Sequence, residues 1–266
     1  MASLVLEPPS TTAEPSDQSK RARDNQDSGR WLVFRYSPAA LFSLKMSRAT
    51  STAGKTLLTP TPYAVKMAFV DAALRHGLTQ DPAGLVRNLA RSNLRIGVPQ
   101  QACVTGTIQR VRQERRDVER KRNPELPLYR GNIAMREVVH YQGAVRLAFD
   151  VETCSPDLIA LVIEVAPAIN YLGKRGSFVQ YLDCVRQMDL DSTFTQPVDD
   201  HNGGLPAWGH RAMLDDFGTR ASFEALNSFS DSEVQSGIHR KFVETIVPLD
   251  VCNVGPGFVH YSASRR

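Results

Sequence analysis

Several features that mark common protein classes are missing from this 266-residue chain. No two of its four cysteines form a Cys-x-x-Cys pair, which argues against a zinc knuckle or a redox dithiol. The cysteines are far apart, at Cys103, Cys154, Cys184 and Cys252. The longest apolar stretch, 158–169, is interrupted by Glu164 and Pro167 and is too short to span a bilayer. With no secretory signal pattern at the N-terminus, we expect a cytoplasmic protein without a membrane segment or a cofactor.

A complete nucleotide-binding loop is also missing, although Gly54-Lys55-Thr56 looks like the end of one. The P-loop pattern requires a glycine at position 49, where this chain has Ala49. Pro60 and Pro62 separate the triplet from the following helix, whereas a P-loop lysine belongs at the helix N-terminus itself. The sequence therefore argues against ATP or GTP binding, and phosphate of another kind remains open.

Positive charge is present but unevenly distributed. The formal net charge is +4, and residues 110–130 alone hold eight basic and four acidic side chains. If a strand continues through this segment, Arg110 and Arg112 share one face and Arg116 rejoins them. Such a row of guanidinium groups suits a sugar-phosphate backbone. A solvated helix or loop, neutralised by Glu114, Asp117 and Glu119, is the alternative that the pattern leaves open.

One helix has strong boundary signals. Thr61 is predicted to cap it, Pro62 suits its first position, and Gly77 closes it. Its core face is predicted from residues at helical spacing, namely Tyr63, Met67, Val70 and Leu74. Lys66 lies between these positions, where a lysine is expected on a solvated flank or, alternatively, at a phosphate.

The order of the remaining elements predicts the fold class. Residues 1–29 are polar and proline-rich, and we expect a disordered tail. We then expect a strand at 31–36, a hairpin turning at Gln142-Gly143, and a helix that Ser155 caps and that ends before Pro167. A glycine-bounded turn, a strand and further strands at 241–251 and 257–263 follow. This order fits an α+β, ferredoxin-like (RRM-like) antiparallel sheet with helices on one face, forming a single domain over 30–266.

Two further basic loops could contact phosphate. Gly173 and Gly176 bound a "GKRG" turn in which backbone N–H groups can approach an anion while Lys174 and Arg175 supply charge. A helix-to-strand turn with two solvated cations is the alternative. Lys45, Arg48 and Lys55 lie among small polar residues after the first strand.

Three segments together are similar to the CRISPR-associated Cas-five family, over about residues 30–185. They are "LLTPTPYAVKMAFVDA", the arginine-rich segment and "NYLGKRGSFVQYL". Members of this family are RNA-binding subunits of type I surveillance complexes (Cascade). The resemblance implies a ferredoxin-like core, a β-hairpin thumb at about 104–150 and binding of the 5′ handle of a crRNA. It also implies contacts with the backbone and large subunits, and with target DNA indirectly through the complex. The candidate RNA contacts are Lys45, Arg48, Lys55, Tyr63, Lys66, Arg110, Arg112, Arg115, Arg116, Gly173, Lys174, Arg175 and Gly176.

Two other functions compete with this one. An endoribonuclease would need a proton-transferring group such as His140 beside Tyr141, but neighbours on a strand point to opposite faces. His76 beside Gly77 is expected in a helix C-cap. A stand-alone RNA-binding protein would carry a pair of stacking aromatics, for which Phe178 and Tyr181 are weak candidates.

The segment 186–238 is predicted to be a long loop insertion with Trp208 and Phe217 as anchors for a partner. It also contains acidic and histidine side chains without recognised metal-ligand spacing, so no metal site is expected. They are Asp189, Asp191, Asp199, Asp200, His201, His210, Asp215 and Asp216.

Overall fold

The computed structural model describes residues 29–46, 53–198, 208–227, 230, 232 and 234–264. The expected tail, except Gly29, and the candidate Arg48 lie outside these residues, as do Asp199, Asp200 and His201. Within the described ranges, no helix is long and apolar enough to cross a membrane.

The central sheet has four strands in the order β3-β6-β1-β7, and every neighbouring pair is antiparallel. These strands are β1 (Trp31–Pro38), β3 (Leu94–Gly97), β6 (Val145–Asp150) and β7 (Val179–Gln187). The chain passes from β1 to β3 through α2 (Pro62–Arg75) and α3 (Pro82–Arg91). It passes from β6 to β7 through α5 (Pro156–Val165). Each helical connection therefore joins two strands that have one antiparallel strand between them, as the predicted order of elements requires.

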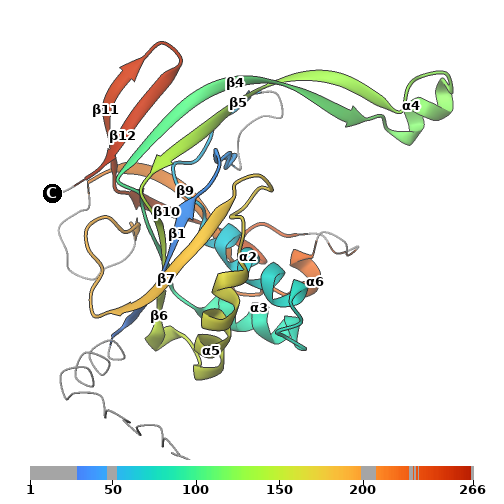
Figure 1. The fold of residues 1–266 in the computed structure, drawn as a ribbon. Helices are drawn as coiled ribbons and strands as arrows, with labels where there is room; N and C mark the ends of the chain where they lie inside the picture. Colours follow the sequence, from blue (N-terminus) through green and yellow to red (C-terminus); the bar gives the residue numbers. More distant parts are fainter. Residues whose placement is uncertain are drawn as a thin grey trace, which may run out of the picture.

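The main core lies between this sheet and its helices. Figure 1 shows α2, α3 and α5 gathered on one side of the sheet. Phe34 on β1, Phe69 on α2 and Phe149 on β6 pack there with ring centroids 5.2–6.1 Å apart. Side chains alternate along a strand, so Trp31 and Val33 point to the opposite face. They form a smaller buried cluster with Ala148 and Phe194.

The helix α2 begins and ends as predicted but buries a different face. Thr61 accepts a hydrogen bond from Ala64 N, and Gly77 has φ +66° after the last turn. The deepest side chains include Val65, Phe69 and Ala72, which were not in the predicted set. Of the predicted core residues, Val70 is buried, Tyr63 and Met67 are half-buried, and Leu74 is exposed. Because apolar residues occur almost all around this helix, their spacing does not determine which face meets the sheet.

The predicted hairpin at Gln142-Gly143 is wrong. Strand β5 (Tyr129–Gln142) pairs with β4 (Gln101–Glu114) along its whole length, and the short helix α4 (Asp117–Arg122) closes their far end. At Gly143, with φ +99°, the chain instead leaves this ribbon and enters the central sheet as β6. The thumb, defined as β4, α4 and β5, thus spans 101–142 rather than 104–150. Strand β6 is apolar enough to be buried between β1 and β3, which explains its different partners.

Two further sheets complete the fold. The thumb belongs to a five-stranded sheet, β11-β12-β4-β5-β2, with β2 (Ala53–Gly54), β11 (Leu249–Gly255) and β12 (Phe258–Ala263). The other sheet, which we call the second small sheet, has three strands in the order β8-β10-β9. They are β8 (Gln196–Pro197), β9 (His210–Phe217) and β10 (Arg240–Val247). The remaining short elements are η1 (Val151–Thr153), η2 (Ala166–Ala168) and α6 (Phe223–Leu226).

Two predictions for the C-terminal third need correction. The single strand expected at 241–251 is two strands, because Pro248 has no N–H for a sheet and separates β10 from β11. The described part of 186–238 is not a plain loop, since it contains β8, β9 and α6. Phe217 is fully buried against the ring of Tyr63, so it is not a surface anchor. Trp208 is 66% exposed, as a surface anchor requires.

Two buried tyrosines predict a loss of stability at alkaline pH. Tyr36 donates to Ala166 O at 2.9 Å and Tyr141 to Leu58 O at 3.1 Å, and burial raises the pKa of both phenols far above the usual value. Above about pH 10 the unfolded chain therefore releases protons that the folded chain keeps, so stability falls as pH rises. We expect a slope of about 1.4 kcal/mol per pH unit for each tyrosine.

Urea unfolding between about pH 9 and 11 measures this slope. Tyr36→Phe and Tyr141→Phe each remove one titrating group and should each flatten the curve. The difference between wild type and variant isolates the tyrosine from all other groups. Equal slopes in all three proteins would contradict the assignment.

Candidate nucleic-acid interface

The thumb reaches well beyond the body of the protein (Figure 1). Strand β12 pairs with β4 only over Gln101–Thr105, and β2 pairs with β5 only at Met135 and Arg136. The distal half of the ribbon therefore has few neighbours, and most of its side chains are exposed. Because a two-stranded ribbon is only marginally stable alone, this exposed length indicates a surface built to be covered by a ligand or partner.

One face of the thumb combines arginines with apolar side chains. Arg110 lies opposite Ile133, and Ile108 lies opposite Met135. Residues directly opposite each other share a face, and Arg112 follows Arg110 at the two-residue period, as predicted. Ile108, Ile133 and Met135 are each more than 60% exposed. Such a face offers guanidinium groups to phosphates and apolar contacts to bases.

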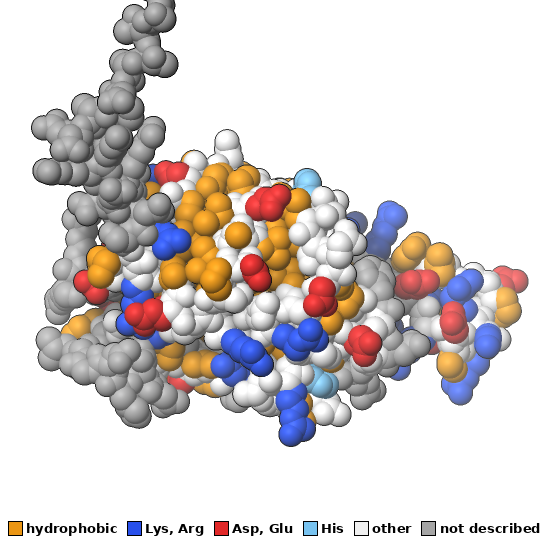
Figure 2. Space-filling model, turned by 90° about the horizontal axis from the view of Figure 1, so that it is seen from below, with side chains coloured by type: hydrophobic (Ala, Val, Ile, Leu, Met, Phe, Trp, Pro, Cys, Tyr) orange, Lys and Arg blue, Asp and Glu red, His pale blue; other side chains and the backbone are white. Residues whose placement is uncertain are grey.

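The tip of the thumb departs from the prediction. Strand β4 ends at Glu114, and Arg116 is the N-cap residue of α4, so Arg116 does not rejoin the Arg110 face. Arg115 donates to Pro127 O at 3.1 Å and lies 3.6 Å from Glu119. These contacts stabilise the conformation of the tip. In Figure 2 the tip is the lobe at the right, where basic and acidic side chains lie together. At the tip, the arginines are therefore neutralised by nearby acidic side chains. At Arg110 and Arg112, the predicted strand with both arginines on one face is present.

The glycine-bounded turn forms a tight exposed loop before β7. Gly173 has φ +76° and Gly176 has φ +101°, a region that other residues rarely adopt. Ser177 N donates to Lys174 O at 3.0 Å and closes the turn. Lys174 and Arg175 are exposed at its apex. The expectation of left-handed glycines with two cations between them is confirmed.

A strip of paired backbone connects the thumb to this loop. Strand β2 runs parallel to β5, with Gly54 beside Arg136. Lys55 O then accepts from Met46 N at 3.1 Å, and Lys45 pairs with Thr56. Residues 54–56 are thus extended rather than wrapped around an anion, in agreement with the argument against a P-loop. The side chains of Lys55 and Lys45 are both exposed along this strip.

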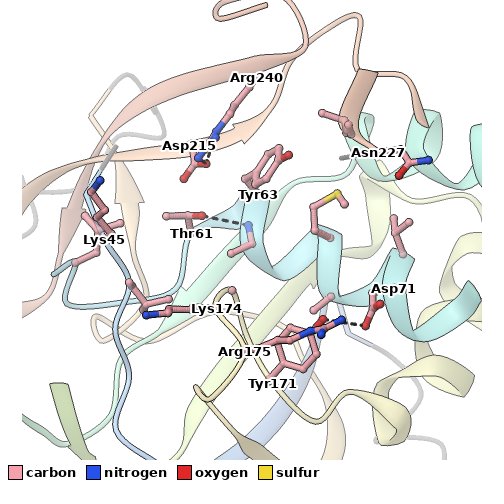
Figure 3. A pocket seen from close by; sticks show the side chains of 18 of the residues that line it. Lys45, Thr61, Tyr63, Asp71, Tyr171, Lys174, Arg175, Asp215, Asn227 and Arg240 are labelled. Carbon is pink, nitrogen blue, oxygen red and sulfur yellow. Dashed lines mark hydrogen bonds and ion pairs between the residues drawn. The ribbon is translucent and has the colours of Figure 1, made fainter. Parts of the chain in front are cut away.

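A cavity of about 690 Å³ lies where the strip meets the glycine loop. Lys45 and the loop residues 173–175 line one side, and Asp215 and Arg240 of the second small sheet line another. Figure 3 shows Tyr63 of α2 beside Asp215 and Arg240. The α2 residues predicted as core, namely Tyr63, Met67, Val70 and Leu74, all line this cavity.

The acidic groups of the cavity are held in place by neighbouring donors. Arg240 donates to Asp215 at 2.6 Å and lies over the Tyr63 ring at 4.5 Å. Asp71 accepts from Arg75 at 2.9 Å and from the Tyr171 hydroxyl at 3.2 Å.

The other cations of the cavity are available to a ligand. Within the described part of the chain, Lys45, Lys174 and Arg175 form no ion pair. The rim of the cavity therefore carries uncompensated positive charge, as a site for an anionic ligand requires.

Lys66 is not a surface contact. Its side chain is 0% exposed, and its ammonium lies 2.8 Å from Asp216 and donates to Ser92 O at 3.0 Å. Burial lowers the pKa of Lys66, and the neighbouring Asp216 carboxylate partly offsets this. The expected solvated flank is therefore wrong, and Lys66 instead ties α2 to β9.

Sequence reasoning missed Arg240 and Tyr171. Arg240 lies at the start of a strand 177 residues after Tyr63, and only the packing of the second small sheet brings the two together. A local signal for this pairing does not exist, because strand and helix contacts of this separation depend on topology. Tyr171 lies two residues before Gly173, so its proximity to the glycine loop follows from the sequence alone.

Those enzymatic candidates that the structure describes do not assemble into a site. His140 is exposed while Tyr141 is buried with a strongly raised pKa, so the two side chains point apart as predicted. His76 is the C-cap residue of α2, as expected. Among the acidic candidates, Asp191 lies 3.2 Å from Arg146, and Asp215 and Asp216 pair with Arg240 and Lys66. Among the described residues, no group of three His, Cys, Asp or Glu is placed to hold a metal.

Comparisons with known proteins give distant structural likenesses only. No protein-family model matches the chain, and no curated protein matches its sequence. A CRISPR protein from Archaeoglobus fulgidus is similar with a TM-score of 0.43 and 12% identity, over 88% of this chain and 92% of that one. A chain of a CRISPR RNA-guided surveillance complex is similar with a TM-score of 0.40 and 13% identity, over 88% of this chain and 90% of that one. Both TM-scores lie below 0.5, and neither likeness assigns a family or an activity to this chain.

Proposed function

We propose that this protein is a non-catalytic, RNA-binding subunit of a type I CRISPR surveillance complex that holds the 5′ handle of the crRNA. The observation that carries this proposal is a series of exposed cations on the thumb, on the paired segment beside β5 and at the rim of the cavity. We call this series the basic strip, and it consists of Arg110, Arg112, Lys55, Lys45, Lys174 and Arg175. An extended chain of phosphates fits a strip of this kind, and the apolar groups beside it suit unpaired bases.

The split β-α-β connectivity supports a ferredoxin-like core, but RNA would not bind it in the manner of a stand-alone recognition domain. In such domains, aromatic side chains on the sheet face opposite the helices stack on bases. Here that face buries Trp31 and Val33 with Phe194, and Arg35 on the same strand pairs with Asp183. Tyr181 packs edge-to-face on Tyr36, although Phe178 is half-exposed. The thumb and the glycine loop are therefore better candidates for the RNA surface.

A non-catalytic role fits the geometry around the only proposed proton-transfer pair. Tyr141 is buried and keeps its proton, so it is a poor partner for the exposed His140. We propose that neighbouring subunits, a backbone subunit and a large subunit, cover exposed apolar groups such as Trp208. Target DNA would be contacted indirectly through the complex, in the cytoplasm.

Replacing Lys174 and Arg175 together by Ala should weaken RNA binding about 10- to 100-fold, since charge-assisted hydrogen bonds contribute about 1.5–3 kcal/mol each and act in part together. The dependence of log affinity on log salt should also become shallower by about 1.4, for two released counterions on a single strand. Fluorescence anisotropy with a single-stranded RNA measures both quantities.

The control is Arg87→Ala with Arg91→Ala on α3, which removes the same charge away from the basic strip. Arg87 is 61% exposed and lies 3.7 Å from Asp81, so its loss should leave the fold intact. An equal loss of affinity in both double variants would mean that only net charge matters.

The complex itself is tested by expressing the protein with its genomic neighbours and a CRISPR array and sequencing the RNA that co-purifies. RNAs that share one repeat-derived 5′ end support the proposal. Heterogeneous RNA, or none, contradicts it, and cleavage assays with and without divalent metal then test the endoribonuclease alternative.

A further inference from the structure

The cavity beside the glycine loop has an apolar floor. Met67, Val70 and Leu74 of α2 line it together with Phe223 and Leu226 of α6. Its volume of about 690 Å³ lies within the range of sites that enclose a small organic ligand, about 300–1,000 Å³. A phosphate would lose its hydration on such a floor without replacement, whereas a planar ring of low polarity would gain contacts.

The rim of the same cavity has the opposite character. Lys45 approaches from the strip, and Lys174 and Arg175 approach from the glycine loop; all three side chains are exposed (Figure 3). A ligand that fits both parts must combine a flat ring with an anionic group. Nucleotides have this combination, with the base for the floor and the phosphate for the rim.

A fixed hydrogen-bond acceptor, Asp71, also lines the cavity. Asp71 is held in place by donors from Arg75 and from the Tyr171 hydroxyl, and it keeps further acceptor capacity. An exocyclic amino group is a suitable donor to it. The site should therefore favour bases that carry such a group over uracil.

We infer that the cavity takes one nucleobase turned out of a bound RNA strand, with the adjoining phosphates on the rim. This inference rests on the proposed RNA-binding function. An RNA strand is the favoured source over a free nucleotide because three exposed cations, Lys45, Lys174 and Arg175, line the cavity together. One phosphate of a mononucleotide would engage only part of this charge, whereas the successive phosphates on either side of an inserted base can use all of it.

The experiment uses the full chain and single-stranded RNAs that contain one 5-iodocytidine, a base that has an amino group and crosslinks to nearby aromatic rings on irradiation. We expect crosslinks at Tyr63 or Tyr171. Ala64→Leu fills the cavity from α2 and should reduce these crosslinks at least about fivefold, the lower end of what base stacking contributes. The matched control is Ala160→Leu, the same change on the exposed face of α5.

A second readout separates base insertion from general damage. RNA with an abasic site at the crosslinked position should bind wild type more weakly than intact RNA, and Ala64→Leu should bind both RNAs equally. Leu74→Trp fills the same cavity from an exposed position and replaces Ala64→Leu if circular dichroism shows misfolding. If the abasic site weakens binding to Ala64→Leu as much as it weakens binding to wild type, the inference is overturned.

The remaining outcomes distinguish the two proposals. Tight RNA binding with crosslinks confined to the thumb would overturn base insertion and leave the proposed function standing. Cytidine monophosphate that saturates the cavity without displacing RNA would mean a free nucleotide is the ligand and would also overturn it. Failure of wild type to bind any RNA would end both proposals.

Discussion

Reversing the charges of Arg110, Arg112 and Arg116 to Glu is expected to lower RNA affinity by about 100-fold or more at low salt, without lowering the unfolding temperature. Each arginine that loses a phosphate contact removes a charge-assisted hydrogen bond of about 1.5–3 kcal/mol, and each glutamate adds repulsion. Arg110 and Arg112 should supply most of the effect because they share the exposed face of β4, whereas Arg116 lies beyond the strand at the N-cap position of α4. Anisotropy across a salt series and thermal unfolding measure the two quantities.

A matched variant tests whether position matters. Arg120→Glu, Lys121→Glu and Arg122→Glu make the same charge change within α4, at the tip of the thumb. Arg120 already lies 3.9 Å from Asp117, so part of this charge is compensated in the folded protein. We expect a smaller loss of affinity than for the variant with Arg110, Arg112 and Arg116 changed to Glu, which we call the ribbon variant. Equal losses would show that the thumb acts only as a diffuse positive charge, and a loss of thermal stability in the ribbon variant would assign Arg110 and Arg112 to the fold.

Local signals predicted the parts of this fold that depend on local chemistry. Thr61 and Ser155 cap their helices because a hydroxyl followed by proline at the first helical position is a strong start signal. The "GKRG" loop was predictable because two glycines at turn spacing permit the left-handed backbone that the structure has there. The order of strands and helices then limited the topology to few choices.

Features that depend on distant partners were not predictable in the same way. The turn at Gly143 looked like a hairpin, but the strand after it pairs with β1 and β3 because its apolar side chains are buried there. The apolar residues of α2 surround the helix, so the sequence could not separate the face on the sheet from the face on the cavity. Arg240 belongs to the candidate site only because β9, the partner of β10 in the sheet, packs against α2.

Lys66 is the clearest example of a residue whose environment the sequence did not predict. Its replacement also has the largest expected effect on stability. Lys66→Ala removes the nearest partner of Asp216 and the donor to Ser92 O, and leaves unfilled volume between α2 and β9. Breaking a buried ion pair from one side costs about 3–5 kcal/mol, because the remaining charge loses its compensation. We expect a loss in this range by urea unfolding at neutral pH.

Lys241 supplies an internal control because it faces the same carboxylate from the surface. Its ammonium lies 4.0 Å from Asp216, and its side chain is 44% exposed. Lys241→Ala should therefore cost less than about 1 kcal/mol. Lys66→Met combined with Asp216→Asn removes both charges while keeping most of the volume, and should recover most of the stability lost by Lys66→Ala. Equal costs for the two lysines would refute the buried pair.

The same variants separate a structural role of Lys66 from the RNA contact that the sequence suggested. A side chain with no exposed surface cannot touch a strand that passes along the basic strip, so folded Lys66→Met protein should bind RNA with wild-type affinity and an unchanged salt slope. Lys174→Ala with Arg175→Ala should show the reverse pattern, with RNA affinity lost and unfolding unchanged. A reduced salt slope in Lys66→Met, measured where the protein is fully folded, would instead place the ammonium at the RNA and require α2 to turn toward the cavity.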